Sequence, residues 1–427
     1  MEENINIPVG WHLKQVVEFA SKMQSGGTPK SDNLEYYNGE IPFVAIDDLS
    51  KSNKYISKTQ KKITNKGLVN SSAWLVPKYS LLYSIYATLG VPRINLIEVA
   101  TNQAILNILP NKKIISLEFL YYLLLEKRNT ILSHSAHTTQ SNLNAKVVKE
   151  LEFVFPKSTI EQDKIAEILS KVDKAISETE IIIAKYNRIK TGLMQDLLTK
   201  GIDENGNIRS EETHEFKDSP LGRIPKEWSV KNLGELITAI DPQPDHRTPP
   251  QVLDGIPYLG ISDFTSSGDI DVINCRKVGY NVLTKQSNTF NLDEGDIIFG
   301  KIGTIGKPKK LPNFEKSPFT LSANVILIKP IECPAFVYWS LISDYVNVQV
   351  SLAIHSTSQP AFGMEKIRAL NIITPQPKER EVITEKLKAF ENIFSEEEKK
   401  LYKLKSIKTG LMQDLLSGKK RVTHLIN

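Results

Sequence analysis

The chain has 427 residues, of which 40% are hydrophobic and 24% charged, which is typical of a folded protein with more than one domain. The net charge of +5 is too small to indicate a nucleic-acid partner by itself. No apolar stretch reaches the roughly 18 residues of a membrane span, and the N-terminus MEENINIPVGW lacks the basic start of a signal peptide. Cys275 and Cys333 are too few for a disulfide framework, so we expect a cytoplasmic protein.

An internal repeat organises the sequence. The segment IKTGLMQDLL occupies residues 189–198 and again residues 407–416. Other landmarks recur at a similar spacing: Pro8 and Trp11 match Pro225 and Trp228, IPFVAIDDL at 41–49 matches IPYLGISDF at 256–264, YSLLYS at 79–84 matches GDIIFG at 295–300, and NQAILNILP at 102–110 matches SANVILIKP at 322–330. We therefore expect two homologous units, each a globular domain followed by a long helix.

Residues 1–156 are expected to form the first globular domain. Short runs rich in β-branched and aromatic residues, such as those at 41–46 and 80–90, are separated by turn residues and predict strands. An apolar stretch at 117–128 predicts a helix. The domain is therefore predicted to be of mixed α/β fold.

Residues 157–200 predict the first long helix. There is no proline from Glu161 to Leu198, and apolar side chains recur every seven residues along one broad face. The 38 residues from Glu161 to Leu198 would form a helix about 57 Å long, which is too long to bury its apolar face against a small domain. It needs a partner of similar length, and the second copy of the helix, within 378–420, is the favoured one. The alternative is two unrelated core helices.

The side chains predicted to pair the helices share these repeating positions. They are Ile165, Val172, Ile176, Ile183 and Leu193 in the first helix, and Ile383, Phe390, Phe394, Leu404 and Leu411 in the second. Residues 201–219 are polar and without periodicity, so they predict a linker between the units. Residues 220–377 predict a second mixed α/β domain, and residues 421–427 a short tail.

The glycine-rich segment GKIGTIGKPKK at 300–310 suggests a phosphate loop but does not match one. Lys301 stands where glycine is required, and Pro308 follows Lys307 where Ser or Thr is required. A β-hairpin and a DNA-contacting loop remain as interpretations. The histidines lack metal-site spacing, and no nucleophile elbow or aminomethyltransferase tetrapeptide occurs. We therefore expect no metal site and no catalytic centre; an unrecognised active site is the enzymatic alternative.

Two polar segments, at 137–144 and 355–363, suit the reading of base edges. Asn and Gln can bond an adenine edge in two places, and Ser or Thr can bond a phosphate. The alternatives are a loop with local backbone hydrogen bonds, and a solvated surface for the lysine-rich stretches. The candidate DNA contacts are Lys30, Lys58, Lys61, Lys62, His137, Thr138, Thr139, Gln140, Asn142 and Asn144 in the first unit, and His246, Arg247, Lys301, Lys307, Lys309, Lys310, Ser358 and Gln359 in the second.

With these marks the chain resembles the specificity subunits of type I restriction–modification systems. The sharpest marks are both copies of IKTGLMQDLL, LGRIPKEWSVKNLGEL at 221–236, SGGTP at 25–29 and TTQSNLN at 138–144. The sequence departs from the pattern in two places. The first unit has only IPVGW in place of the Leu-Gly-x-Ile-Pro lead-in, and the second has QPAFGMEKI in place of QSNLN.

The resemblance implies that each globular domain is a target recognition domain reading one half of a split, double-stranded DNA site. It implies that the two helices run antiparallel as a coiled coil that sets the gap between the half-sites. Two methyltransferase subunits carrying S-adenosylmethionine would be partners, and two restriction subunits using ATP and Mg²⁺ would be further partners. The chain itself would hold no cofactor. The alternative function is a pseudo-symmetric protein scaffold that does not read DNA bases.

Overall fold

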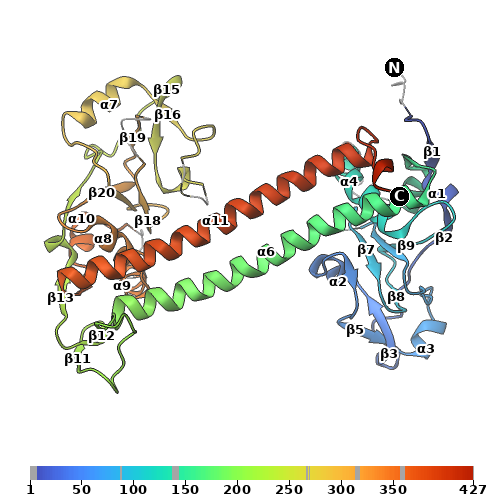
Figure 1. Ribbon diagram of the computed structural model, residues 1–427, viewed down its shortest axis with the longest axis horizontal. Coiled ribbons are helices and arrows are strands. Elements are labelled where there is room, and N and C mark those ends of the chain that lie inside the picture. Colours follow the sequence, from blue (N-terminus) through green and yellow to red (C-terminus); the bar gives the residue numbers. More distant parts are fainter. Residues whose placement is uncertain are drawn as a thin grey trace. The chain divides into compact units, whose positions relative to one another are not determined.

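The computed structural model describes residues 7–86, 89–136, 144–265, 268, 270–312, 318–355 and 361–426. The chain divides into two compact units (Figure 1). Unit 1 comprises Met1–Thr179 together with Lys400–Asn427, and unit 2 comprises Glu180–Lys399. Unit 1 is therefore built from both ends of the sequence, whereas unit 2 is continuous.

Unit 1 is a mixed α/β domain with three groups of strands. A five-stranded sheet has the order β2-β9-β6-β7-β4, a three-stranded sheet has the order β5-β3-β8, and β1 pairs with β10. The strands are β1 (Trp11–Gln15), β2 (Ala20–Ser25), β3 (Tyr37–Val44), β4 (Tyr55–Ile56), β5 (Lys61–Ile63), β6 (Leu81–Ser84), β7 (Pro92–Asn95), β8 (Ala100–Thr101), β9 (Ile105–Pro110) and β10 (Glu152–Pro156). The helices are α1 (Val16–Phe19), α2 (Ile46–Lys51), α3 (Asn65–Val69), α4 (Leu117–Ala136) and α5 (Ala145–Glu150).

Unit 2 has the same kinds of layers. A four-stranded sheet has the order β14-β20-β17-β18, a three-stranded sheet has the order β16-β15-β19, and two further pairs are β13-β21 and β11-β12. The strands are β11 (Phe216–Ser219), β12 (Gly222–Pro225), β13 (Ser229–Asn232), β14 (Ile237–Ile240), β15 (Gln251–Leu259), β16 (Lys277–Val278), β17 (Ile297–Gly300), β18 (Gly306–Lys310), β19 (Thr320–Leu321), β20 (Val325–Pro330) and β21 (Asn371–Thr374). The helices are α7 (Tyr280–Ser287), α8 (Pro334–Leu341), α9 (Asp344–His355) and α10 (Met364–Arg368).

Most strands of the two units follow the same order, whereas β4 of unit 1 and the β11-β12 pair of unit 2 have no counterpart. The order β2-β9-β6-β7 matches β14-β20-β17-β18, and β5-β3-β8 matches β16-β15-β19. Even the mixed pairing is kept, because β3 runs parallel to β8 and β15 runs parallel to β19. Two tandem domains of one mixed α/β fold are present, and the fold class expected from the sequence is confirmed.

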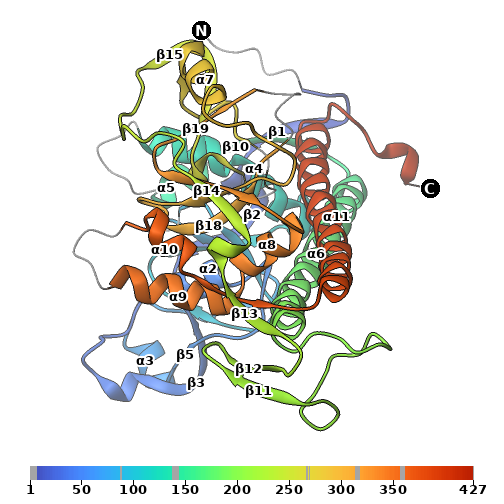
Figure 2. The same ribbon diagram turned by 90° about the vertical axis from the view of Figure 1, so that its left-hand side faces the viewer.

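The two long helices are α6 (Thr159–Thr199) and α11 (Pro377–Leu416). Each unit contains part of both helices, and Figures 1 and 2 show α6 and α11 side by side. In unit 1 Lys408 Nζ lies 2.7 Å from Asp173 Oδ1, and in unit 2 the Tyr186 and Phe390 rings lie 5.8 Å apart. Later residues of α6 thus meet earlier residues of α11, which confirms the predicted antiparallel packing.

The predicted pairing residues differ in how deeply they are buried. Ile165 and Ile383, near the helix starts, are fully buried because each also packs into the core of its unit. The other eight are half-buried: Val172, Ile176, Ile183, Leu193, Phe390, Phe394, Leu404 and Leu411. A pair of helices covers only one side of each apolar face, which leaves the remainder of that face accessible.

Candidate nucleic-acid interface

Unit 2 contains a polar cleft of about 300 Å³ between its two sheets. It is lined by the loop after β14, the strand β15, the residue before β16, the hairpin between β17 and β18, and the turn between β19 and β20. The polar side chains that line it are Thr248, Ser262, Asp263, Arg276, Thr304, Ser322 and Asn324. Segments distant in the sequence therefore meet at one concave surface with many hydrogen-bonding groups.

The glycine-rich segment forms the hairpin between β17 and β18, as one of the two interpretations predicted. Gly300 pairs with Gly306, and a Cβ added to Gly300 would lie 1.7 Å from the Thr304 carbonyl oxygen. Only glycine fits this close approach. Of the predicted basic residues here, Lys307 is exposed and Lys309 half-buried, with Lys309 Nζ 5.9 Å from the centre of the Phe264 ring.

Lys301, a predicted DNA contact, is buried and paired with a carboxylate. Its ammonium group donates a hydrogen bond to Asp241 Oδ2 at 2.6 Å and lies 3.4 Å from His246 Nδ1, and only 8% of the residue is exposed. A buried ammonium paired with a carboxylate is not free to neutralise a phosphate. Instead, the pair fixes the loop that carries His246 and Arg247, whose side chains are exposed beside the cleft.

The predicted candidates of unit 1 have different surroundings. Lys30, Lys58, Lys61 and Lys62 are exposed, and Lys62 lies near Glu40 with 3.9 Å between Nζ and Oε2. Asn144 instead caps α5, because its Oδ1 accepts a hydrogen bond from Val147 N at 2.9 Å. The local-loop alternative therefore applies to Asn144. His137, Thr138, Thr139, Gln140, Asn142, Ser358 and Gln359 lie outside the described residues.

Arg276 was not among the predicted DNA contacts, although it matches a predicted contact in the other half of the repeat. Tyr258 N donates to Arg276 O at 2.8 Å, and in unit 1 Phe43 pairs with Lys61 at the matching place of the sheet. Arg276 therefore occupies the strand position of Lys61, a predicted contact. Likewise Lys301 N bonds Asn324 O at 2.7 Å where Ile85 N bonds Ala104 O at 2.9 Å. Matched positions thus carry different chemistry in the two units.

Each long helix begins at a Trp–Arg–Glu arrangement, which we term the helix-start clasp. In unit 1 Glu161 accepts hydrogen bonds from Arg421 at 2.6 and 2.7 Å, and the guanidinium lies 5.7 Å from the Trp11 ring. In unit 2 Glu379 accepts from Arg209 at 2.6 and 3.2 Å. Here the guanidinium lies 5.9 Å from the Trp228 ring.

The clasp of unit 2 also changes the interpretation of residues 201–219. They were expected to form a linker, yet Arg209 is held at Glu379 and Phe216–Ser219 pairs with Gly222–Pro225. Ile202 is buried, and its backbone N–H donates to Glu379 Oε1 at 3.1 Å. The segment is therefore folded onto unit 2, because Ile202 is buried and Arg209 is paired with Glu379.

A lysine–aromatic cluster contacts one of the long helices in each unit. In unit 1 Lys54 Nζ contacts Ser170 Oγ at 2.9 Å and the ring of Tyr122 at 4.4 Å, and it pairs with Glu118. In unit 2 Lys310 Nζ contacts Glu391 Oε2 at 3.0 Å and the ring of Tyr338 at 4.3 Å. Burial lowers the pKa of Lys54. Lys310, a predicted DNA contact, therefore also contacts α11, with 43% of its side chain exposed.

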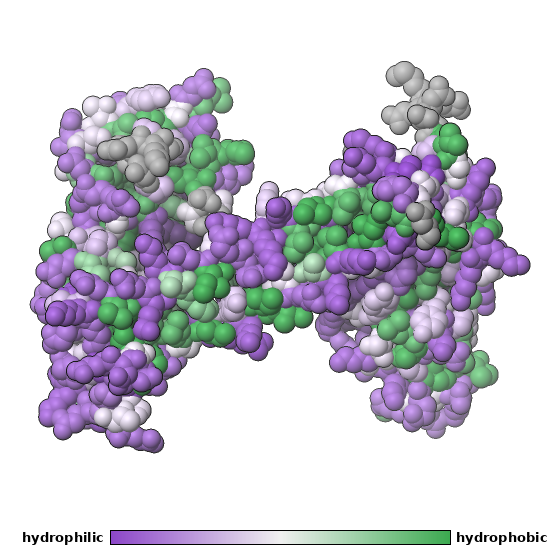
Figure 3. Space-filling model, viewed as in Figure 1, coloured by the Kyte–Doolittle hydropathy of each residue, from purple (hydrophilic) through white to green (hydrophobic). Residues whose placement is uncertain are grey.

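The duplicated segment leaves a repeated apolar surface on the helices. Ile189 and Ile407 occupy the same position of the two copies and are 40% and 41% exposed. Gly192 and Gly410 follow three residues later, on the same helical face, with nothing within 4 Å of an added Cβ. Figure 3 shows hydrophobic residues gathered along the long helices on this face of the molecule.

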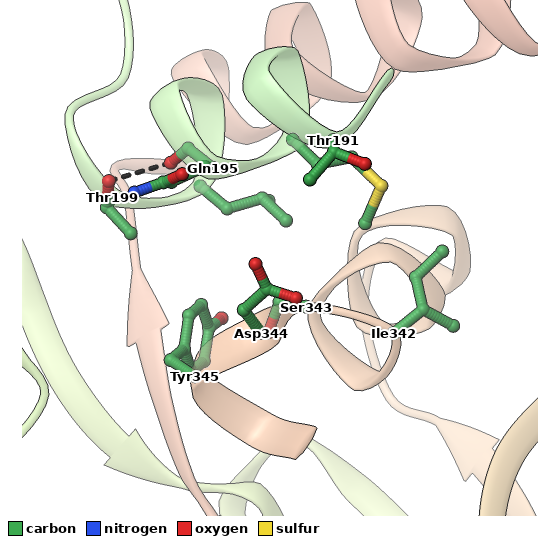
Figure 4. A pocket seen from close by; sticks show the side chains of 9 residues that line it. Thr191, Gln195, Thr199, Ile342, Ser343, Asp344 and Tyr345 are labelled. Carbon is green, nitrogen blue, oxygen red and sulfur yellow. Dashed lines mark hydrogen bonds between the residues drawn. The ribbon is translucent and has the colours of Figure 1, made fainter. Parts of the chain in front are cut away.

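A groove of about 250 Å³ lies beside this surface in unit 2 (Figure 4). The C-terminal turns of α6 form one wall with Thr191, Met194, Gln195, Leu198 and Thr199, and the start of α9 forms the other. Figure 4 shows Asp344 and Ser343 on the opposite side from Gln195 and Thr191. Four of the five α6 residues belong to the duplicated segment, so the groove is lined by the part of the sequence that is kept identical.

Two further features concern the residues that the structure describes. No group of three or more His, Cys, Asp or Glu side chains is arranged to hold a metal ion there. In the same part of the chain, no helix is long and apolar enough to cross a membrane.

Comparison with known proteins decides the family. The family model described as type I restriction modification DNA specificity domain matches residues 8–186 and again residues 225–406. This chain belongs to that family. As a specificity-domain protein it contains the domain twice, one copy in each half of the repeat, and the resemblance seen in the sequence is confirmed.

Relatives of known type agree with this membership, and a solved structure has the same fold. The type I restriction enzyme MjaIX specificity subunit of Methanocaldococcus jannaschii is 27% identical over 98% of this chain and 95% of its own length. The MjaVIII specificity subunit of the same organism is 23% identical over 99% and 95%. The crystal structure of a type I restriction–modification S subunit from M. genitalium matches with a TM-score of 0.60 at 15% identity, covering 97% of this chain and 98% of that one.

Proposed function

We propose that this specificity-domain protein reads a bipartite DNA target, one half with each unit, and carries no catalytic centre of its own. The observation that carries the proposal is the contrast within the repeat. Matched strand positions differ, as with Arg276 and Lys61, while the helix segment IKTGLMQDLL is identical in both copies. Two different half-sites require different reading surfaces, whereas one kind of partner bound twice requires identical ones.

The partners in this proposal are two methyltransferase subunits, with two restriction subunits as further members of the complex. S-adenosylmethionine, ATP and Mg²⁺ would belong to those subunits, which would perform the base flipping and the chemistry. The exposed Ile189–Gly192 face and its copy at Ile407–Gly410 support binding of the same subunit at two places. A glycine inside a helix costs about 1 kcal/mol relative to alanine, and close approach of a partner would offset that cost.

Domain exchange tests the DNA-reading part of the proposal. Replacing residues 220–377 by the matching domain of another specificity subunit should change one half of the methylated motif and leave the other half unchanged. The measurement is mapping of methylated sites made by the reconstituted methyltransferase complex. A change in both halves, or an isolated chain that methylates DNA without partners, would contradict the proposal. Absence of salt-sensitive duplex binding would instead favour the protein-scaffold alternative.

Bulky substitutions test the docking part. Gly192→Leu should remove one methyltransferase subunit, Gly410→Leu the other, and the double variant both, as measured by the mass of the complex. Gly192→Ala and Gly410→Ala are matched controls, because alanine favours the helix and adds only a methyl group. Complexes of unchanged mass with all leucine variants would show that the partner binds elsewhere.

A further inference from the structure

The cleft of unit 2 contains side chains whose hydrogen-bonding groups are uncommitted within the protein. Ser262, Thr304 and Asn324 line the cleft and are exposed. Within the described ranges, none of the three has a side-chain hydrogen bond to another residue. A side chain that reads a base edge needs free donors and acceptors in the unbound protein. By contrast, the ammonium group of the nearby Lys301 is already paired with Asp241.

Arg276 combines a fixed position with unused donors. Its Nη2 donates to the Pro249 carbonyl oxygen at 2.6 Å, which orients the guanidinium, while its buried Nε has no partner among the described residues. A guanidinium has five N–H groups, and a buried one left without an acceptor is unfavourable. A ligand that accepts hydrogen bonds in the cleft would correct this deficit.

We propose, building on the proposed function, that Arg276 determines specificity by reading a guanine in the half-site recognised by unit 2. The planar fork of arginine matches O6 and N7 of guanine in the major groove. Asn324 on the same cleft would contact a neighbouring base.

The position of Arg276 favours a base over a phosphate. The residue is half-buried and lines the cleft, whereas Arg247 and Lys307 are exposed outside its lining and suit the DNA backbone. The matching position in unit 1 is the exposed Lys61, which lacks the planar fork. The proposal therefore also explains why one fold can read two different half-sites.

The test uses the complete complex with its methyltransferase subunits and maps methylation over a library of target variants. Arg276→Ala should reduce discrimination at one guanine position of one half-site by roughly 5- to 150-fold and leave the other half-site unchanged. Arg276→Lys keeps the charge but not the fork, so discrimination should fall while the salt dependence of binding is retained. Arg223→Ala is the control, since Arg223 pairs with Glu211 and Asp218 away from the cleft.

The outcomes separate the inference from the function on which it rests. If the wild-type complex methylates a bipartite motif and both Arg276 variants keep that motif, the inference is wrong and the proposed function stands. A uniform loss of affinity for all sequences, with a smaller salt slope, would make Arg276 a phosphate contact and also overturn the inference. A wild-type complex without sequence-specific binding would contradict the proposed function itself. If Arg276→Ala does not fold, Arg276→Lys decides between these results.

Discussion

The two units have the same framework and different reading surfaces. At the helix starts the same three residue types recur, with Glu161 and Glu379 at one position of the repeat and an arginine on each. At matched positions of the sheets the residues differ, since Lys301 and Asn324 of unit 2 stand where unit 1 has Ile85 and Ala104. The same residue types recur where each unit packs against the long helices. They differ where the sheets form a surface.

The contacts that connect each unit to the long helices are not identical in the two units. Trp228 Nε1 donates to Glu379 at 2.8 Å, whereas the buried Trp11 Nε1 has no partner among the described residues. The lysine–aromatic cluster shows the reverse order. The Lys54 side chain is 11% exposed, and the Lys310 side chain is 43% exposed. Each unit therefore has one strong and one weaker connection to the long helices.

The largest expected effect comes from Glu379→Ala. The substitution leaves the Trp228 indole N–H and the Ile202 N–H without their acceptor, and Arg209 keeps only Glu227 as a carboxylate partner. We expect the free energy of unfolding to fall by about 3–5 kcal/mol, mainly because two buried donors lose their acceptor. Glu161→Ala should cost less, about 1–3 kcal/mol, because the side chain of Arg421 is 31% exposed and water can replace the carboxylate. Chemical denaturation measures both.

Glu381→Ala is the control for this pair, since Glu381 lies two residues away on the exposed side of α11. Its loss should change the free energy of unfolding by less than about 0.5 kcal/mol. Equal losses for Glu379→Ala and Glu161→Ala would remove the asymmetry between the clasps.

Substitutions of Lys54 and Lys310 should have smaller effects on stability than those at the clasps. Here the substitution in unit 1 should cost more than the one in unit 2. Lys54→Met removes a buried cation that bonds Ser170 and covers the Tyr122 ring, and we expect a loss of about 1–3 kcal/mol. Lys310→Met breaks a more exposed pair and should cost at most about 1 kcal/mol. Thermal melting of both variants provides the comparison, with the exposed Lys58→Met as control. A greater loss for Lys310→Met would reverse the assigned order.

The smallest effect concerns acid stability and is specific to unit 1. Burial, followed by the charges of Lys14 and Lys157, lowers the pKa of His12 below its usual value of 6.5. The unfolded chain therefore binds more protons than the folded one between the two pKa values. Above pH 6.5 the titration of His12 does not change the stability of the protein. Stability is lost as the pH falls from 6.5 towards the pKa of His12 in the folded protein.

His12→Phe keeps the edge-on contact with Phe155, whose ring lies 4.3 Å away, and removes the titration. The melting temperature of this variant should decrease less than that of the wild type between about pH 7.5 and about pH 5. Ser229 follows Trp228 where His12 follows Trp11, so unit 2 lacks this pH-sensitive group. Identical decreases in the two proteins would exclude His12 as the cause.

The sequence predicts those features that repeat at short intervals. The absence of proline and the seven-residue spacing identify α6 and α11, and the alternation of short apolar runs with turns indicates the mixed sheets. It does not predict which polar groups pair across long separations. Lys301 meets Asp241 sixty residues away and Lys54 meets Ser170, so both leave the surface where lysines normally lie. Arg276 was missed because its role depends on strand register.

The division of the chain also has a consequence for the order of folding during synthesis. Unit 2 is one continuous segment, whereas unit 1 needs Arg421 to reach Glu161 and the carbonyl oxygen of Val9, at 2.6 Å in each case. Closing such long loops carries an entropic cost that grows with loop length. Domains usually fold in the order in which the ribosome releases them. Here the domain that begins first is completed last, when the C-terminal helix emerges.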